Sequence, residues 1–517
     1  CLVADALGME TVFVHPYAGV LSAYGMGLAE IRAMRERQFE RSLSDYADAV
    51  AGLDELAAEA RAEVVSQGVE DGVITSELRA HLRYSGSHQS LEIDFGTPEE
   101  LRERFDAAHK ARYGFSHGDK DIIVEALSAE AIGGASDVAD QTFSLTAGSP
   151  DPVDTVAAVM ESEARQIALY DRDKMLRGQA IDGPAIIKEP TGTNIIEPGW
   201  RAAVNEYGHL ILTRTTPLER AEAVGANADP VMLEVFNNLF MSIAEQMGAT
   251  LANTAYSVNI KERLDFSCAL FDPTGALVAN APHVPVHLGS MSESIRTVIR
   301  LNPDMKKGDV FVLNAPFNGG THLPDVTVIT PVFDEAGKDV LFYVASRGHH
   351  ADIGGKTPGS APPDSSHIEE EGVLIDNFKM VDGGVLREAE TRALLASGKY
   401  PCRNIDENMA DLAAQVAANE TGVREVEKMI RQFGLPIVHA YMTHVQDNAE
   451  ECVRRVITAL KDGHYDYELD NGEFIRVAIR VDRENRQAEI DFTGTADKNP
   501  YNYIAPLAVC HAVVLYV

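Results

Sequence analysis

The most informative segment of the sequence is Val310-Phe-Val-Leu-Asn-Ala-Pro-Phe-Asn-Gly-Gly-Thr-His-Leu-Pro-Asp325, in which a short apolar run ends in a glycine-rich loop with a histidine and an aspartate. Two further apolar runs follow, Val326–Val332 and Val340–Ser346, and Asp334–Lys338 between them has the composition of a turn. We therefore predict three successive strands, with the second and third paired as an antiparallel hairpin. The third strand leads into Arg347-Gly-His-His-Ala-Asp352.

The position of the turn sets the expected register of this hairpin. Antiparallel pairing about residues 336–337 joins residues whose numbers sum to about 673, so Asp325 faces Gly348. Opposed residues lie about 5 Å apart, and His322 should therefore converge with Asp325 and with one of His349 or His350. A single His-x-x-Asp is more often a hydrogen-bonded loop pair, so the prediction depends on the second histidine. Two imidazoles and a carboxylate with open positions predict a site for a divalent cation such as Mn, Fe or Zn.

Composition limits the classes of protein to which the chain can belong. The 517 residues correspond to roughly three to four domains, and 45% hydrophobic and 24% charged residues are usual for a globular protein. Asp and Glu outnumber Lys and Arg by 79 to 45, which gives a net charge of -34. Such a surface repels phosphate backbones and anionic lipid, so we expect no nucleic-acid partner and no membrane partner.

Cysteine usage and apolar run length indicate a cellular location. The five cysteines are scattered and form no Cys-x-x-Cys pair, a pattern typical of reduced thiols in a cytoplasmic protein. No apolar run reaches the roughly 18 residues that a membrane helix needs. The chain begins at Cys1 within a helical pattern and ends in an apolar run at Val517. We therefore expect a cytoplasmic protein of which this chain is a piece.

Changes in pattern along the chain predict a mixed α/β, multidomain protein. We expect an α/β tail, then an α+β to β-rich domain with short strands broken by Gly and Pro, then a polar linker bounded by prolines, and finally an α+β domain. The predicted segments are, in this order, 1–38, 39–216, 217–229 and 230–517. Asp229 and Pro230 are suited to the first turn of the helix that opens the last segment.

Other motifs of catalysis are absent from the sequence. Lys356-Thr357 resembles the end of a phosphate-binding loop, but His350 stands where that loop needs a glycine. No Gly-x-Ser-x-Gly is present, and we expect Cys268 to be a buried strand residue. His283 and His287, taken alone, are expected to be structural. We predict that the chain does not bind ATP by itself.

Several long strings resemble the hydantoinase B/oxoprolinase family. They are Asn259–Phe271, Asn280–Ser290, Gly320–Asp325, Ala345–His350 and Gln415–Asn419. Val20–Ala29 resembles the tail of the hydantoinase A-type half, and Ile181–Ile187 resembles the β-rich end of that half. In this family the two halves are separate subunits or, in the 5-oxoprolinase type, one polypeptide with the A-type half first. An A-type tail joined to a B-type start favours the fused 5-oxoprolinase type, as does the run Ser242–Met247.

The resemblance implies ATP-dependent hydrolysis of the lactam of 5-oxo-L-proline to L-glutamate, with ADP and phosphate. The amide oxygen would be phosphorylated in the A-type half, so that ATP with Mg would bind upstream of this chain. The implied partners are a small cyclic amide and the missing A-type ATPase half of the same polypeptide, and we expect a homo-oligomer.

The resemblance also implies roles for individual residues. Relatives that carboxylate acetone hold manganese through a His-x-x-Asp and a later histidine. Carried over, the metal ligands are His322, Asp325 and His349, with Mn as the first candidate ion. The remaining expected site residues are His350 and Asp352 as catalytic groups, and His283, His287 and Arg347 as substrate-binding groups. Asp352 departs from the glutamate of the 5-oxoprolinase type, which leaves the substrate open.

Three alternatives remain. An ATP-dependent hydantoin amidohydrolase would share the fold and the metal loop, but the fused halves argue modestly against it. An acetone or acetophenone carboxylase-type subunit would usually occur with its halves as separate chains. A non-catalytic scaffold subunit would have no need for the His322, Asp325 and His349 set.

Overall fold

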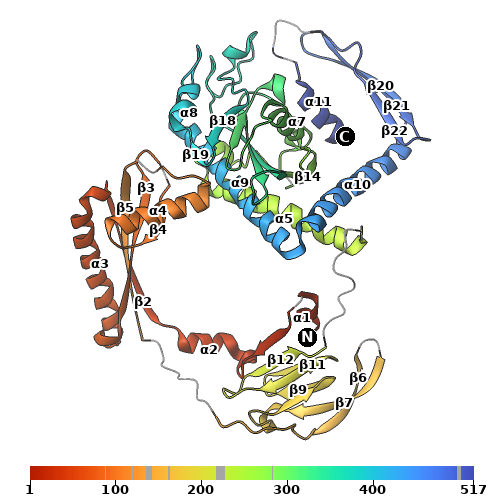
Figure 1. The fold of residues 1–517 in the computed structure, drawn as a ribbon. Coiled ribbons are helices and arrows are strands. Elements are labelled where there is room, and N and C mark those ends of the chain that lie inside the picture. The colour runs from red at the N-terminus through yellow and green to blue at the C-terminus, as the bar shows by residue number, and fades with distance from the viewer. Residues whose placement is uncertain are drawn as a thin grey trace. The chain divides into compact units, whose positions relative to one another are not determined.

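The computed structural model describes residues 1–7, 9–87, 89–117, 120–134, 143–160, 163–216, 227–281, 283–497, 502 and 504–516. These residues form a mixed α/β structure with five β-sheets, which confirms the predicted fold class (Figure 1). The chain divides into two compact units. Unit 1 comprises Cys1–Arg37, Asp48–Leu78 and Leu127–Ala223, and unit 2 comprises Gln38–Ala47, Arg79–Ala126 and Val224–Val517. None of the helices in the described part of the chain combines the length and apolar character that a bilayer span requires.

Unit 2 is built around a seven-stranded sheet of order β14-β13-β17-β16-β15-β18-β19. The strands are β13 (Phe266–Phe271), β14 (Leu277–Asn280), β15 (Val310–Leu313), β16 (Asp325–Phe333), β17 (Val340–His349), β18 (Phe378–Asp382) and β19 (Val385–Leu386). Every residue of β13, β15 and β16 is buried. The central strands therefore have both faces covered, which explains why their sequences are continuous apolar runs rather than alternating ones.

Helices cover the two faces of this sheet. Tyr343 and Ala345 of β17 pack in one apolar cluster with Ile295 of α7 (Pro285–Leu301). Phe342 and Val344 point to the other face and pack with α5 (Pro230–Thr254), α9 (Ile405–Phe433) and α10 (Leu435–Ala459). This alternation follows from the two-residue period of a strand. It assigns each residue of the hairpin either to the α7 face or to the α9 face.

The helix starts follow ordinary capping rules. Asp229 accepts hydrogen bonds from the amides of Val231 and Met232, and Pro230 occupies the first helical position of α5, as predicted. The side chain of Asn404 accepts a hydrogen bond from the amide of Glu407 and so caps α9. Helix α9 ends where Gly434 adopts a positive φ of 86°.

The predicted hairpin is confirmed, but its register differs by one residue. Asp325 lies opposite His349, not opposite Gly348. Near the turn Phe333 pairs with Val340, in agreement with the expected register. A β-bulge then places one extra residue, Leu341, on β17. The prediction was wrong beyond that point because the bulge shifts every later pair, including the pair that carries the candidate ligands.

A segment from early in the chain also belongs to unit 2. It contains α4 (Pro98–Tyr113), which has a capping box between Thr97 and Glu100 and ends at Gly114 with φ 77°. Helix α4 packs against α9. The neighbouring sheet has the order β2-β5-β3-β4 and consists of β2 (Ile31–Ser42), β5 (Ile122–Gly133), β3 (Thr75–Tyr84) and β4 (Leu91–Asp94). Helix α3 (Tyr46–Ser66) belongs to unit 1 from Asp48 onward.

The other part of unit 1 is β-rich, as predicted. Two four-stranded sheets, β1-β12-β11-β8 and β10-β9-β7-β6, enclose an apolar core around the fully buried Trp200. Their strands are β1 (Thr11–Val14), β6 (Asp154–Met160), β7 (Glu163–Asp171), β8 (Ala180–Asp182), β9 (Ala185–Glu189), β10 (Gly192–Ile196), β11 (Trp200–Val204) and β12 (Leu210–Arg214). Short helix α1 (Leu2–Leu7) precedes β1, and α2 (Leu21–Leu28) follows it.

The compact units do not coincide with the predicted segments. Residues 79–126 fall inside the predicted segment 39–216 but group with 224–517, because α4 packs against α9. The segments 1–38, 39–216 and 230–517 therefore stay a prediction about domains. Of the predicted linker 217–229, residues 217–226 lie outside the described residues.

The remaining elements belong to unit 2. They are α6 (Val258–Lys261), α8 (Glu388–Leu395), β20 (Gly463–Glu468), β21 (Phe474–Asp482), β22 (Gln487–Asp491) and α11 (Leu507–Tyr516). Strands β20, β21 and β22 form a three-stranded antiparallel sheet.

Candidate metal centre

Three predicted ligands meet where β16 begins and β17 ends. Nδ1 of His322 lies 3.1 Å from Oδ2 of Asp325, and Nδ1 of His349 lies 3.2 Å from Oδ1 of the same carboxylate. One ligand atom from each residue falls within 4.8 Å of the other two. The three side chains therefore converge, with His349 rather than His350 beside Asp325, and their role as metal ligands stays a prediction. We call these three residues the metal cluster.

The glycine-rich loop brings His322 to the cluster. Gly319 has a φ of 84°, and a Cβ on Gly320 would lie 2.4 Å from the carbonyl oxygen of Asn314. The loop therefore folds back closely over the end of β15, which only glycine permits. The side-chain amide of Asn314 donates to the carbonyl of Leu323 at 2.8 Å and holds the segment after His322 in place.

The Asp325 carboxylate is the buried centre of the metal cluster. Its Oδ2 accepts a 2.8 Å hydrogen bond from the Thr321 hydroxyl and a 3.2 Å hydrogen bond from Nε2 of His287. Burial alone would raise the pKa of Asp325, but hydrogen bonds from His287, His322 and His349 outweigh burial and hold this pKa well below its usual range. The carboxylate is therefore ionised, as a metal ligand must be.

The two histidines of the metal cluster differ in exposure. The side chain of Asp325 is 2% exposed, whereas that of His322 is 47% exposed. Burial would lower the pKa of His349, but the hydrogen bond and the negative charge of Asp325 outweigh burial and raise it. The cluster is thus closed on the Asp325 side and open to solvent on the His322 side, which leaves room for a further ligand.

The donor set and the spacing both fit a divalent cation. Metal–nitrogen and metal–oxygen bonds of about 2.1 Å that meet at right angles place neighbouring donor atoms about 3 Å apart. The measured nitrogen–oxygen separations are 3.1 and 3.2 Å. Imidazole and carboxylate donors together suit Mn, Fe and Zn. Three protein ligands leave coordination positions open for water or substrate.

His287 supports the cluster from α7. Its Nε2 donates to Asp325, so its Nδ1 accepts the hydroxyl hydrogen of Ser267, at 2.8 Å. The imidazole is buried, and burial lowers the pKa of His287 although Asp325 acts in the opposite direction. These contacts orient the carboxylate in the way that groups behind metal ligands commonly do. The predicted substrate contact of His287 stays a prediction.

Arg347 lies behind the cluster on the α7 face and has no exposed surface. Its Nε donates to the Thr327 hydroxyl at 2.7 Å, and its other nitrogens donate to the hydroxyls of Ser290 and Ser294. Burial lowers the pKa of Arg347 to about 10, which still leaves it a cation at neutral pH. The guanidinium thus ties together β16, β17 and α7. Its predicted substrate contact also stays a prediction.

The structure does not bring His350, Asp352 or His283 into the metal cluster. His350 is fully buried on the α9 face, and both of its ring nitrogens have partners, as described below. The Asp352 carboxylate accepts hydrogen bonds from the amides of Gly354 and Gly359 and from Arg403, whose Nη1 lies 2.6 Å away. Nδ1 of His283 accepts the amide of Cys268 at 3.2 Å, and burial lowers the pKa of His283 to about 4. The catalytic and substrate roles given to these residues stay predictions.

Two polar groups near the cluster escaped sequence reasoning. Thr321 directly precedes His322 and donates to Asp325. The Asp265 carboxylate lies 3.9 Å from Nδ1 of His349, on the exposed side. Both fall within strings that resemble the family, and this was the available signal. Nothing in their spacing distinguished them from ordinary loop residues.

Comparison with known proteins places the chain in a family. The model of the hydantoinase B/oxoprolinase family matches residues 229–517, and the hydantoinase/oxoprolinase model of the A-type half matches residues 1–35. The chain belongs to the hydantoinase B/oxoprolinase family. Its A-type tail precedes its B-type portion in one polypeptide, as the resemblance had indicated.

The chain is similar along its whole length to 5-oxoprolinases of this family. It is 39% identical to 5-oxoprolinase 1 of Arabidopsis thaliana over 100% of the chain and 43% of the relative. It is 36% identical to the 5-oxoprolinase of Dictyostelium discoideum over 100% of the chain and 41% of that protein. The crystal structure of the ATP-dependent caprolactamase from Pseudomonas jessenii matches with a TM-score of 0.51 and 26% identity, covering 56% of this chain and 50% of that one. The chain thus spans about two fifths of the length of these two curated relatives.

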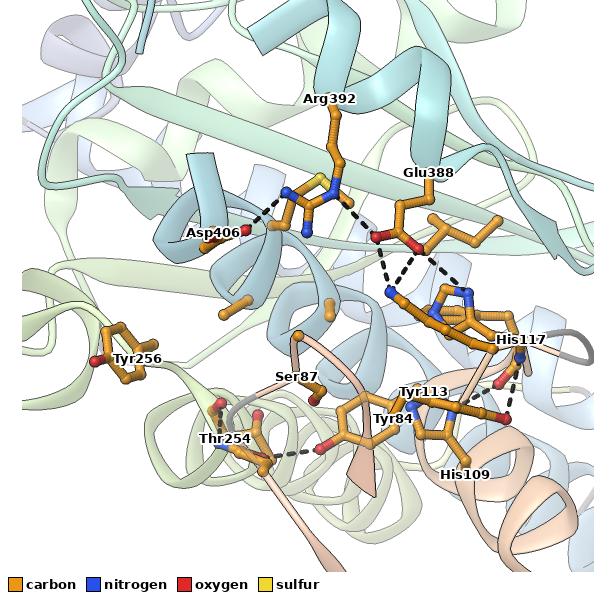
Figure 2. A pocket seen from close by; sticks show the side chains of 18 residues that line it. Tyr84, Ser87, His109, Tyr113, His117, Thr254, Tyr256, Glu388, Arg392 and Asp406 are labelled. Atoms are coloured by element: carbon orange, nitrogen blue, oxygen red, sulfur yellow. Dashed lines mark hydrogen bonds and ion pairs between the residues drawn. The ribbon is translucent and has the colours of Figure 1, made fainter. Parts of the chain in front are cut away.

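Unit 2 of this hydantoinase B/oxoprolinase chain also holds a cavity of about 90 Å³ on another side of α9. Aromatic rings line one wall, among them Tyr84, His109 and Tyr113, and charged groups from α8 and α9 line the other (Figure 2). Sequence reasoning did not identify this cavity, although the spacing of histidines and aromatic residues over 109–117 was a usable signal.

The charged wall is organised around Glu388. Both of its oxygens accept from Nζ of Lys120 at 2.9 Å, and one also accepts from Nε of Arg392 at 2.9 Å. Nδ1 of His117 lies 3.5 Å from Glu388, and Arg392 donates to Asp406 at 2.7 Å (Figure 2). We call Glu388, Lys120, His117 and Arg392 the Glu388 cluster. The carboxylates of Glu388 and Asp406 together balance the positive charges of Lys120 and Arg392, so a charged ligand would have to break existing ion pairs.

Proposed function

We propose that the chain is part of an ATP-dependent cyclic amide hydrolase that opens the lactam of 5-oxo-L-proline to L-glutamate, with ADP and phosphate as the other products. The observation that carries this proposal is the similarity of the whole chain, A-type tail and B-type portion together, to proteins named 5-oxoprolinase. The caprolactamase similarity supports the same reaction class, because that enzyme is also named for a lactam and for ATP.

ATP with Mg is assigned to the A-type half outside this chain, in the same polypeptide. An unactivated amide resists hydrolysis, and phosphorylation of its oxygen would make the carbon open to attack by water. The complete protein is expected to be a homo-oligomer. A cytoplasmic location agrees with the five cysteines, all of which are free thiols.

His322, Asp325 and His349 are proposed as the ligands of a divalent cation, with Mn as the first candidate. Such an ion would polarise a substrate carbonyl or lower the pKa of a bound water. Asp325 would supply the negative charge, held in orientation by Thr321 and His287. The open side next to His322 is where a substrate could approach.

The decisive assay uses the complete protein and compares three substrate mixtures. We would follow ADP release with 5-oxo-L-proline, with hydantoin, and with acetone plus bicarbonate. We expect ADP release only with 5-oxo-L-proline, in step with glutamate formation. Turnover of hydantoin or acetone alone would overturn the substrate, and no turnover with any of the three would favour a scaffold subunit.

A pair of histidine variants tests the metal in the same protein. His322→Ala should lose bound metal, measured by elemental analysis after gel filtration, and should lose activity with it. His464→Ala is a suitable control, because His464 is an exposed residue of β20 outside the metal cluster. Equal metal content in the two variants would contradict the proposed ligand set.

A further inference from the structure

The α9 face of the metal-bearing hairpin carries buried polar side chains where apolar packing would be expected. Asn408, Asp411, Gln415 and Asn419 of α9 are all buried. Their spacing of three or four residues places them along one side of the helix. Buried amides are costly unless they are hydrogen-bonded, so their partners indicate what they are for.

Gln415 contacts both strands of the hairpin at once. Its Nε2 donates to the carbonyl of Val326 on β16 at 2.9 Å and to the carbonyl of Ser346 on β17 at 3.1 Å. The Ser346 hydroxyl in turn donates to the backbone carbonyl of Gln415 at 3.2 Å. One fully buried side chain therefore bridges two neighbouring strands.

The third bond of Gln415 reaches His350, the residue that follows ligand His349. Nδ1 of His350 accepts from the side-chain amide of Asn408 at 3.0 Å, so its Nε2 carries the hydrogen and donates to Oε1 of Gln415 at 3.1 Å. Both ring nitrogens of His350 are thus used inside the protein. These two bonds anchor the backbone beside His349 to α9 through its neighbour His350.

We propose that Gln415 is a positioning residue for the metal centre. Its partners are Val326, next to Asp325, and His350, next to His349, together with Ser346 on β17. The Gln415 amide thereby fixes the distance between the backbone positions from which Asp325 and His349 extend to the α7 face. The proposal depends on the metal centre put forward above and adds a residue that does not touch the ion.

Glutamine is the side chain that this position requires. It offers two N–H hydrogens and one acceptor oxygen, and all three are used. Methionine has a similar length but no donor. Asparagine has the same groups but is one methylene shorter, so it cannot reach both strands and His350 together.

Asn419 provides a matched control one helical turn further along α9. It is also buried, and its amide donates to the carbonyl of Val328 and to the hydroxyl of Thr330, each at 3.1 Å. These partners lie on β16, further from Asp325 than Val326 is. Loss of the Asn419 bonds should weaken the fold without moving the ligands.

The test measures Mn²⁺ affinity of the 517-residue chain by electron paramagnetic resonance of the free ion, and stability without metal by urea denaturation. Removing a group behind a metal ligand typically weakens metal affinity about 10- to 100-fold. We expect a loss of this size in Gln415→Met and a smaller loss in the shorter Gln415→Asn, which is the milder variant if Gln415→Met does not fold. Asn419→Leu should lower the urea midpoint while changing Mn²⁺ affinity less than about threefold.

Three outcomes would overturn the inference. If a folded Gln415 variant bound Mn²⁺ as tightly as the wild type, Gln415 would not be a positioning residue. Affinity losses that simply follow stability in both the Gln415 and Asn419 variants would reduce Gln415 to a structural residue. If the wild-type chain did not bind Mn²⁺, the proposed metal centre itself would be wrong. This result is distinguishable from the other two because it concerns the wild type and not the variants.

Discussion

Asp325 and Glu388 are both carboxylates surrounded by basic side chains in unit 2, yet the two clusters differ in chemistry. The basic groups around Asp325 are imidazoles, which offer a lone pair once they are neutral. Around Glu388 the main partners are Lys120 and Arg392, which have no lone pair to give and stay charged. The type of base, not the number of bases, separates a candidate metal centre from an ion-pair cluster.

Burial strengthens this difference. The side chain of Asp325 is 2% exposed and that of Glu388 is 23% exposed. At Asp325 the imidazole protons can be exchanged for a cation, which would keep the buried charge compensated. At Glu388 the charges are already compensated by Lys120 and Arg392.

The largest expected effect comes from removing the charge of Asp325. Asp325→Asn keeps the size of the side chain but removes the anionic ligand, so Mn²⁺ affinity should fall more than about 100-fold, beyond the usual loss for a supporting residue. Titration with Mn²⁺ and resonance detection of the free ion measures this. Glu388→Gln is the paired control and should bind Mn²⁺ like the wild type. If both variants lost affinity equally, the distinction between the clusters would be wrong.

An intermediate effect is expected for stability at the second cluster. Glu388→Gln leaves Lys120 and Arg392 without their shared carboxylate, which should lower the free energy of unfolding by about 2 kcal/mol. Urea denaturation of the metal-free chain measures the change. Glu390→Gln on the same helix is the control, because Glu390 is an exposed partner of Arg387 and should cost no more than about 0.5 kcal/mol. Equal shifts in both variants would contradict the view that Glu388 holds the cluster together.

The smallest expected effect is the pH dependence of the free energy of unfolding that comes from His109, in the aromatic wall of the cavity. Burial lowers the pKa of His109 to about 4, and its Nδ1 donates to the carbonyl of Phe115 at 2.8 Å. The unfolded chain, with a histidine pKa near 6.5, binds the proton first as pH falls, so acid favours unfolding. Lowering the pH from 7 to 5.5 should therefore reduce the free energy of unfolding by roughly 1 kcal/mol through His109. His109→Phe should lose that part of the pH dependence, and an unchanged slope in urea denaturation would show that His109 is not its source.

The sequence was a good guide to local structure and a poor guide to contacts between distant segments. The cap at Asp229 and Pro230 and the hairpin around residue 336 depend on neighbouring residues, and both are found as predicted. The predicted register of the hairpin is wrong by one residue beyond the bulge at Leu341. An extra residue in a strand leaves no trace in a continuous apolar run.

The candidate site was partly predictable for the same reason. His322, Asp325 and His349 lie on two strands joined by a short turn, so their convergence could be inferred from the turn. The contact of His287 with Asp325 depends on how α7 packs over the sheet, which no local pattern reveals. The bond between Lys120 and Glu388 joins residues 268 positions apart. Sequence spacing cannot predict a contact between residues so far apart in the chain.

Unit 2 is built from segments on both sides of the stretch 217–226, which affects where a gene of this family can be divided. Contacts such as Lys120 with Glu388, and Arg424 with the carbonyl of Ala111 at 2.6 Å, join residues that precede the stretch 217–226 to residues that follow it. If the A-type and B-type portions were encoded as two polypeptides, division at this stretch would separate the two sides of unit 2. The same contacts would then have to form between chains, and gene fission would turn an intramolecular core into a subunit interface.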